Sequence, residues 1–487
     1  MSVPSTLDRF DAMLGNALER ALCSHHRRRL ARRGHGRALD PPQGALPGWA
    51  DTGSFAPAGG SSVELLVDGA HALPLLADEI AAATRHVHVA GWFFSPDFRM
   101  GDGGPTLGAL LSAAAERVDV RVLAWAGAPL PLFHPDRAEV RLMRDELIRG
   151  TRISMALDAR ERPLHCHHEK LVVVDDDVAF VGGIDLTSLG GERLDDSVHP
   201  QRDGLGWHDA CVRLEGPIVA DVAEHFLLRW RAIADDAPPD PRRAAPVERG
   251  VDAQLVRTVP EHVYRGLPRG EFSIAESYVR ALQSAERFVY LESQFLWSPE
   301  LVSILAGKLR EPPRDDFRLV VLLPVHPNNG TDDTRGQLGV LVDAATQGGG
   351  EFRFLACTLY QPGLGGKPVY VHAKVGIVDD RWLTVGSANL NEHSLFNDTE
   401  VNVVVHDEEL VRAARLRLWS EHLELTVEEV DGDPSRVIDE CWRPLAKRNA
   451  EHRRLHGYTP HRLVTLPHVS RRTEALRGPL NGLLVDG

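Results

Sequence analysis

The stretch VHAKVGIVDDRWLTVGSANLNEHSLFNDTE, residues 371–400, decides how this chain folds. Its first part alternates in the manner of a strand, so His372 and Lys374, two positions apart, are predicted to share one face. Two aspartates then predict a turn, a second apolar run predicts the returning strand, and small residues up to Ser387 and Asn389 predict a bend. An imidazole, an ammonium group, a hydroxyl and an amide thus converge on one spot, which suits a phosphate.

The same pattern occurs 204 residues earlier (372 minus 168), in HEKLVVVDDDVAFVGGID at 168–185. One HxKxxxxD match can arise by chance, but two copies, each followed by an apolar run and a glycine-rich bend, indicate a duplicated functional unit. The shared positions are His168, Lys170 and Asp175 in the first copy and His372, Lys374 and Asp379 in the second.

The double HxKxxxxD motif resembles the phospholipase D superfamily. The resemblance extends from about residue 62 to about residue 445 and is closest to the phospholipid-cleaving branch. It is carried by GGIDL (182–186), WHD (207–209), GPIVADVAEHFLLRW (216–230), YLESQF (290–295) and VGSANLNEHS (385–394). It implies two similar α/β sandwich halves that pack about a pseudo-two-fold axis and share one active site.

The order of expected elements also predicts an internal duplication. Apolar runs of strand length alternate with helical patterns on both sides of a proline-rich break, which predicts α/β halves with parallel strand pairs. ATRHVHVAGWFF (83–94) and AERFVYLESQFL (285–296) share residues at an offset of 202, close to the motif offset. The predicted division is a basic N-terminal helix and linker at 1–60, a first half at 61–235, a linker at 236–260, a second half at 261–431 and a C-terminal extension at 432–487.

The residue types suit phosphodiester cleavage. Imidazole can attack phosphorus and leave again, and a second, protonated imidazole can protonate the leaving oxygen. We assign His168 as the nucleophile, as the resemblance implies for a first-motif histidine, and His372 as the general acid and then base; the near-symmetry leaves the reverse assignment open. Lys170 and Lys374 would hold the phosphoryl oxygens, with help from the bend residues of the second motif. This chemistry needs no metal ion, and we expect no cofactor.

Four other positions complete the expected site. A reacting histidine needs its second nitrogen oriented, and Asp209 and Glu400 are the candidates. In the first copy Gly183 and Asp185 replace the serine and asparagine of GSxN, and the resembling branch often carries this GGID form. The two halves are therefore chemically unequal.

The motif aspartates, Asp175 and Asp379, are predicted to act structurally. They match the family's motif, but they fall in turns beyond the strand, where salt bridges or turn capping are expected of them. The run from His165 through Cys166 and His167 to His168 resembles a metal cluster. Adjacent histidines on a strand point to opposite faces, however, so we predict no metal site from this run.

Composition excludes several classes of protein. A formal net charge of −14 over 487 residues argues against a general nucleic-acid binder. Five scattered cysteines without a CxxC pair predict neither a disulfide framework nor a zinc module. No secretory signal or membrane-spanning run is visible, so we expect a cytoplasmic protein that makes peripheral contact with the membrane. We favour a monomer. The basic run HHRRRLARRGHGR at 25–37 predicts either peripheral contact with anionic lipid or, as we favour, a solvated face or frayed terminus.

We expect a phospholipase D that cleaves glycerophospholipids with water or an alcohol as acceptor, through a covalent phosphohistidine. The alternative is a phosphatidyl transferase of the cardiolipin synthase type. A nuclease of the same superfamily is less favoured because this chain is long, duplicated and acidic. A non-catalytic lipid-binding scaffold would have no need for two histidines paired with lysines.

Overall fold

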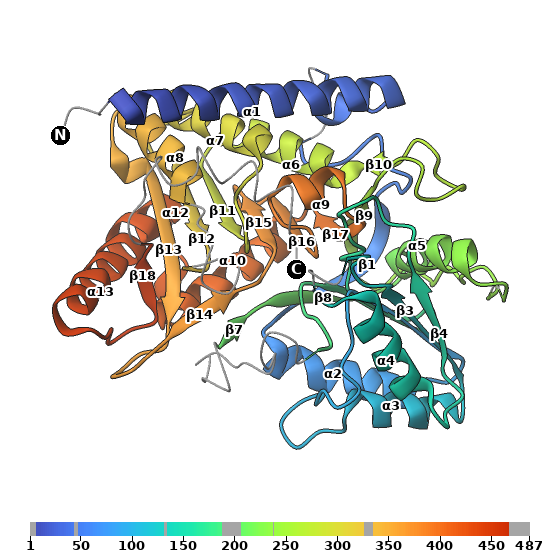
Figure 1. The fold of residues 1–487 in the computed structure, drawn as a ribbon. Coiled ribbons are helices and arrows are strands. Elements are labelled where there is room, and N and C mark those ends of the chain that lie inside the picture. The colour runs from blue at the N-terminus through green and yellow to red at the C-terminus, as the bar shows by residue number, and fades with distance from the viewer. Residues whose placement is uncertain are drawn as a thin grey trace.

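The computed structural model describes residues 6–42, 47–130, 134–187, 206–236, 238–325 and 335–466. Two mixed β-sheets lie next to each other, and each carries its own layer of helices on the side away from the other (Figure 1). The two α/β halves that the duplication predicts are therefore present.

The first sheet has the strand order β4-β3-β2-β5-β6-β8-β1. Strands β2, β3 and β4 are parallel because crossover helices connect them, whereas the remaining neighbours are antiparallel. The strands are β1 (Ala58–Val67), β2 (His86–Gly91), β3 (Asp119–Trp125), β4 (Ser154–Asp158), β5 (Leu171–Val174), β6 (Val178–Gly182) and β8 (Ala210–Glu215).

The second sheet repeats this plan in the order β13-β12-β11-β15-β16-β17-β9. Its parallel strands are again the three at one end, and β1 of the first half pairs with β9 of the second. The strands are β9 (Val251–Val259), β10 (Glu271–Phe272), β11 (Phe288–Glu292), β12 (Arg318–Leu322), β13 (Phe354–Tyr360), β15 (Val375–Val378), β16 (Trp382–Gly386), β17 (Glu400–Val405) and β18 (Leu463–Thr465). A short parallel pair, β7 (Trp207–His208) with β14 (Pro368–Val371), links the halves.

The helices form two outer layers and a central pair. The first sheet is covered by α2 (Gly69–Ala82), α3 (Leu107–Ala115) and α4 (Arg137–Ile148). The second is covered by α6 (Ser273–Ser284), α7 (Pro299–Arg310) and α8 (Arg335–Gln347). Between the sheets, α5 (Ile218–Ile233) and α10 (Glu408–Leu423) join the inner strand faces in the largest core. The remaining helices are α9 (Glu392–Phe396), α11 (Val427–Val430), α12 (Pro434–Val437), a π-helical turn (Ile438–Trp442), α13 (Arg443–His456) and 3₁₀ turns at Gly36–Ala38 and Glu351–Arg353.

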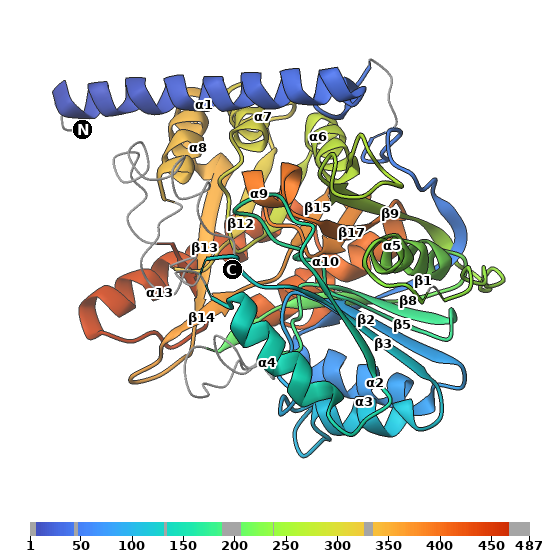
Figure 2. The ribbon, with the colours of Figure 1, turned by 45° about the vertical axis from the view of Figure 1, so that its right-hand side comes forward.

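The N-terminal helix α1 (Thr6–Arg33) lies across α6, α7 and α8 (Figures 1 and 2). His26 lies 3.0 Å from Glu300 and 2.8 Å from Glu392, and Arg29 lies 2.6 Å from Glu261. The interpretation of this basic run as solvated or frayed is therefore wrong for His26 and Arg29, which pair with acids of the second half, whereas Arg27, Arg28 and Arg32 are exposed. None of the described helices is long and apolar enough to cross a bilayer.

Three predicted boundaries differ from the structure. The N-terminal linker is bound to the second half, since Gln254 on β9 hydrogen-bonds to both the N–H and the carbonyl of Ala50. The linker at 236–260 contains strand β9, whose partner β17 is remote in sequence and therefore invisible to local composition. The C-terminal extension supplies β18, which extends the second sheet beside β13, and its residues 467–487 lie outside the described part of the chain.

The motif aspartates hold matching turns in the two halves. Asp175 and Asp379 both have φ of 56°, in tight β5–β6 and β15–β16 turns that require the left-handed region. The Asp175 carboxylate accepts hydrogen bonds from the backbone N–H groups of residues 84, 85 and 86 at 2.7–2.8 Å. Asp379 accepts from residues 286, 287 and 288 at the same distances. Each aspartate thus ties its turn to the start of the adjacent strand.

We predict that Asp175→Asn lowers the free energy of unfolding by about 1–3 kcal/mol, because an amide cannot accept the same set of N–H donors. Burial acts to raise the pKa of Asp175, but the N–H groups of His86 and Thr84 outweigh it and the pKa is lowered. The stabilisation is therefore complete above the unfolded-state pKa of about 4 and is lost as the pH falls. Urea unfolding at pH 7 and pH 3 measures both effects.

Asp177→Asn in the same turn is the matched control, because that side chain is 55% exposed and, among the described residues, pairs only with surface arginines. Its expected effect is about 0.5 kcal/mol or less. Equal losses in the two variants would contradict the structural role of Asp175.

Candidate active site

The two motif histidines lie where strands are interrupted. Residues 372–374 separate β14 from β15, and the first motif directly precedes β5, so the continuous strand expected through His372 and Lys374 is wrong. The break arises because β14 pairs with β13 and β7, whereas β15 pairs with β11 and β16. The chain changes partners at the motif.

Each motif backbone is anchored to the opposite half. The N–H of His168 donates to the carbonyl of Thr399 at 2.9 Å, and the N–H of His372 donates to the carbonyl of His208 at 2.8 Å. The neighbouring N–H groups of Glu169 and Ala373 donate to the same two carbonyls. The halves therefore position each other's histidines.

Each predicted orienting carboxylate also comes from the half opposite to its histidine. Nδ1 of His168 lies 2.9 Å from Glu400 Oε1, and Nδ1 of His372 lies 2.7 Å from Asp209 Oδ2. Glu400 begins β17 of the second half and Asp209 precedes β8 of the first, so each carboxylate holds the histidine of the other half. Because Nδ1 of each ring is engaged, Nε2 is the nitrogen that would react.

The two motif lysines are buried beside the histidines. Lys170 Nζ donates to the His168 carbonyl at 2.7 Å and lies 3.6 Å from Asp185, and Lys374 Nζ donates to the carbonyl of His372. Burial lowers the pKa of Lys374 to about 7, despite the opposing charge of Asp209. Two cations that lie close together in a buried site repel each other, and this arrangement favours binding of an anion.

Hydroxyl groups surround Glu400. Ser387 Oγ donates to Glu400 Oε2 at 2.5 Å, and Ser394 Oγ donates to Glu400 Oε1 at 2.6 Å. Burial raises the pKa of Glu400 to about 8, although Lys170 and both hydroxyls act in the other direction. The Ser387 hydroxyl thus holds Glu400 in this structure, and direct phosphate binding by Ser387 stays a prediction.

The GGID departure has a steric reason. A methyl group on Gly183 would overlap Oδ1 of Asp209, the residue that orients His372. In the second half the equivalent position is Ser387, whose side chain contacts the equivalent carboxylate, Glu400, through its hydroxyl. The first half therefore combines glycine with a close aspartate, and the second half combines serine with glutamate. Each combination leaves room for the carboxylate that orients a histidine.

Asn389, expected to bind phosphate, is fully buried at the end of the second motif. Its Nδ2 donates to Gln294 Oε1 at 3.4 Å, and Gln294 Nε2 donates to the Tyr370 hydroxyl at 2.7 Å. The Oδ1 atom of Asn389 is buried without a hydrogen-bond partner among the described residues. Its first-half counterpart, Asp185, instead lies beside Lys170.

Sequence reasoning assigned no role to a buried network beneath the site. His208 lies 2.9 Å from Asp68 and 2.8 Å from Glu292, which also lies 3.0 Å from His422. Burial opposes the charge of His208, but Glu292 and Asp68 raise its pKa well above the usual value. His208 and Glu292 lie in the WHD and YLESQF segments, so the family resemblance could have indicated them. No motif in the sequence indicated Asp68 or His422.

A second network lies behind the first motif. Arg229 of α5 forms ion pairs with Asp158 and Glu169, and His167 lies 3.3 Å from Asp158. His167 and His168 thus lie in different environments, as their adjacency in sequence predicts. The contacts of His167 support the structure around the site rather than the reacting atoms.

The arrangement supplies what transfer of a phosphoryl group requires. Two imidazoles held by carboxylates can act as nucleophile and proton donor, and two lysines can stabilise the phosphoryl oxygens. All four residues are at most 5% exposed. In such a site charge stabilisation is stronger than it would be in water.

We predict that Gly183→Ala destabilises the protein by about 1–3 kcal/mol, because the added methyl group must displace Asp209 from His372. Gly307→Ala in α7 is the control, since no atom lies within 4 Å of the added carbon there. Alanine in that half-buried helical position should be neutral or stabilising by up to about 1 kcal/mol. Urea unfolding of both variants measures the difference, and a neutral Gly183→Ala would contradict the proposed steric constraint.

Comparison with known proteins agrees with this geometry. Residues 278–420 match a family model described as "Cardiolipin synthase, PLD-like domain". The chain is 27% identical to phospholipase D A of Dictyostelium discoideum over 75% of this chain and 36% of that protein. It is 24% identical to phospholipase D1 of Schizosaccharomyces pombe over 86% of this chain and 41% of that protein. The chain thus spans roughly two fifths of the length of these relatives.

A solved structure supports the fold. The crystal structure of phosphatidylserine synthase from Haemophilus influenzae aligns with a TM-score of 0.51 at 11% identity, over 76% of this chain and 88% of that one. Together with two reciprocal histidine–carboxylate pairs on duplicated HxKxxxxD motifs, these matches identify the fold as phospholipase D-like. In its motifs, its fold and these relatives, the chain is similar to the phospholipase D superfamily.

Proposed function

We propose that this protein is a phospholipase D, which cleaves the phosphodiester of a glycerophospholipid and transfers the phosphatidyl group to water or an alcohol. The observation that carries the proposal is the exchange of carboxylates, His168 with Glu400 and His372 with Asp209. In this exchange, each motif histidine is held by a carboxylate of the other half, which supports one site built from both motifs. The phospholipase D relatives support the choice of substrate class.

In the proposed reaction, Nε2 of His168 attacks phosphorus and the bond to the headgroup oxygen breaks. His372 gives its Nε2 proton to that oxygen as it leaves. Water or an alcohol then loses a proton to His372 and attacks the phosphohistidine, which releases phosphatidic acid or a new phospholipid and restores both imidazoles. Lys170 and Lys374 hold the phosphoryl oxygens through both steps.

The second candidate is a phosphatidyl transferase of the cardiolipin synthase type, which the description of the matching family model favours. It uses the same phosphohistidine and differs only in the acceptor. With phosphatidylglycerol as sole substrate, a phospholipase D would yield phosphatidic acid and glycerol. A transferase would yield cardiolipin and glycerol.

We predict that His168 carries the covalent phosphatidyl group. His372→Asn mixed with phosphatidyl-p-nitrophenol should accumulate the adduct, because nitrophenolate leaves without a proton donor while the second step lacks its base. His168→Asn should show no adduct and a turnover reduced by on the order of 10³-fold or more. Acid-quenched digestion with mass spectrometry locates the modified histidine.

An adduct on His372 in the reverse pair of variants would keep the mechanism and exchange the two roles. Absence of both adduct and turnover with every common phospholipid would contradict the proposed function. Retained lipid binding without turnover in the unaltered protein would instead favour a non-catalytic lipid-binding protein.

We also predict that kcat/KM falls as the pH rises above about 7. Lys374 carries its charge below its pKa of about 7 and loses it above, so the free enzyme then attracts the substrate phosphate less strongly. A Lys374→Arg variant that retains activity should lack this basic limb, because guanidinium does not titrate in the range. A limb that persists unchanged in this variant would assign it to another group.

A further inference from the structure

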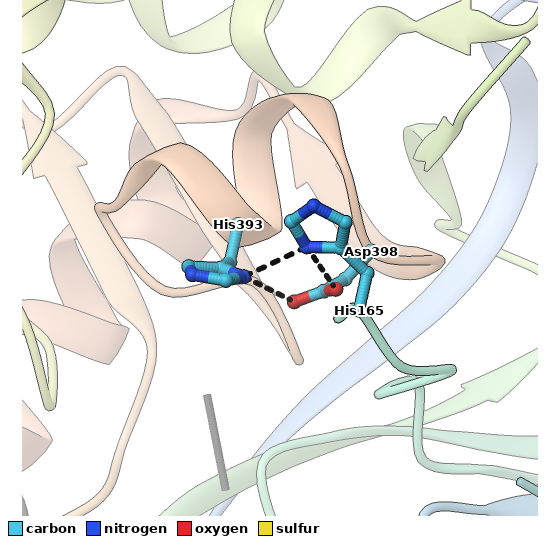
Figure 3. Close-up of side chains that lie close together, drawn as sticks. All are labelled: His165, His393 and Asp398. Atoms are coloured by element: carbon cyan, nitrogen blue, oxygen red, sulfur yellow. Dashed lines mark hydrogen bonds and ion pairs between the residues drawn. The ribbon is translucent and has the colours of Figure 1, made fainter. Parts of the chain in front are cut away.

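Two imidazoles and a carboxylate meet next to the active site without a part in the proposed reaction (Figure 3). His165 lies in the loop before the first motif, His393 in α9, and Asp398 between α9 and β17. Nδ1 of His165 lies 2.9 Å from Nδ1 of His393 and 3.4 Å from Asp398 Oδ1. Nδ1 of His393 lies 3.7 Å from Asp398 Oδ2.

The polar atoms that face one another in this cluster cannot all form hydrogen bonds with each other. The two Nδ1 atoms face each other, so only one of two neutral rings can carry a proton there and the other presents a lone pair. Asp398 is fully buried, and its Oδ2 has no hydrogen-bond partner among the described residues, although it points at His393. A cation between the three groups would satisfy every one of these lone pairs.

The spacing fits a tetrahedral metal ion. Metal–ligand bonds of about 2.0–2.1 Å at tetrahedral angles place the ligand atoms about 3.3 Å apart. The two Nδ1 atoms lie 2.9 Å apart, and the two carboxylate oxygens of Asp398 lie 3.4 Å (Oδ1 to His165) and 3.7 Å (Oδ2 to His393) from them, on both sides of that value. Two imidazole nitrogens and one carboxylate oxygen leave a fourth position for water, and 13% exposure of the His165 side chain provides an approach from solvent.

We propose that His165, His393 and Asp398 form a binding site for a divalent transition-metal ion, with Zn²⁺ the expected occupant. Imidazole and carboxylate donors together suit Zn²⁺ and its neighbours rather than Mg²⁺ or Ca²⁺. The site is separate from the reacting histidines and does not depend on the proposed reaction.

Two other groups of histidines and acids differ from this cluster in how their side chains pair. His208 places each ring nitrogen against a separate carboxylate, that of Asp68 or that of Glu292, so its protons have matched acceptors. His26 presents its Nδ1 to the carboxylates of both Glu300 and Glu392, with no second imidazole between them. These are ion pairs of a charged imidazole with acids, whereas the cluster at His165 has imidazole facing imidazole.

The ion would join the segments that form the active site. The N–H of Cys166 donates to Asp398 Oδ1 at 2.9 Å, and the N–H of Thr399 donates to the Cys166 carbonyl at 3.1 Å. Two residues further along each segment, His168 meets Glu400. A metal ion held by both segments would therefore stabilise the contact between the halves at the point where the orienting carboxylate sits.

The test is metal titration of the chelator-treated full chain. Co²⁺ should bind with one ion per chain and give the visible absorption of a tetrahedral complex, and Zn²⁺ should displace it and raise the Tm. His165→Gln, at the solvent edge of the cluster, should weaken binding on the order of 10²-fold, and Asp398→Asn should do the same. His134 is exposed and pairs with Glu139, so His134→Gln is the matched control and should bind as the unaltered protein does.

His26→Gln tests the competing cluster, and metal binding lost in that variant but kept in His165→Gln would overturn the assignment. Absence of a tetrahedral Co²⁺ spectrum in the unaltered protein would overturn it as well. Because Asp398→Asn can affect folding, diethyl pyrocarbonate labelling of the unaltered protein provides a further measurement. Zn²⁺ should protect His165 and leave His134 reactive, and equal labelling of His165 with and without Zn²⁺ would contradict the site.

Discussion

The exchange of carboxylates between the two halves is the contact on which the rest of the structure depends. A histidine that must act as nucleophile or acid needs a fixed ring and a defined tautomer, and each half supplies that constraint only to the other. Glu400 reaches His168 and Asp209 reaches His372, while Thr399 and His208 bind the backbone N–H groups of the same histidines. Neither half could therefore form a competent site alone.

This arrangement buries several charged groups, and networks of ion pairs compensate their charges. His208 is held between Asp68 and Glu292 beneath the second motif, and Arg229 pairs with Asp158 and Glu169 behind the first. Breaking one partner of such a pair would leave an uncompensated charge in a low-dielectric interior. The contact between His208 of the first half and Glu292 of the second crosses the interface, so a shifted interface would separate these two charges.

The repeated halves are alike in topology and unlike in chemistry. The strand order recurs in full, and the turn aspartates repeat their contacts with the start of β2 and of β11. The orienting pairs differ, since Gly183 leaves room for a close aspartate, whereas Ser387 donates to a longer glutamate. His165 of the first half and His393 of the second add a further cluster beside the site. A duplicated scaffold has therefore been adapted separately at each motif.

The sequence by itself determined the duplication, the α/β class, the motif residues and both orienting carboxylates, because these depend on spacing and residue type. It did not show that the strand breaks at His372, since β14 and β15 have different partners that lie far away in the chain. It also could not assign β9 or β18 to the second sheet. Which carboxylate serves which histidine, and the meeting of His165 with His393 across 228 residues, were decided only by tertiary structure. The reason is physical: local patterns encode which face of an element is apolar, whereas contacts across the interface depend on how the two assembled halves pack.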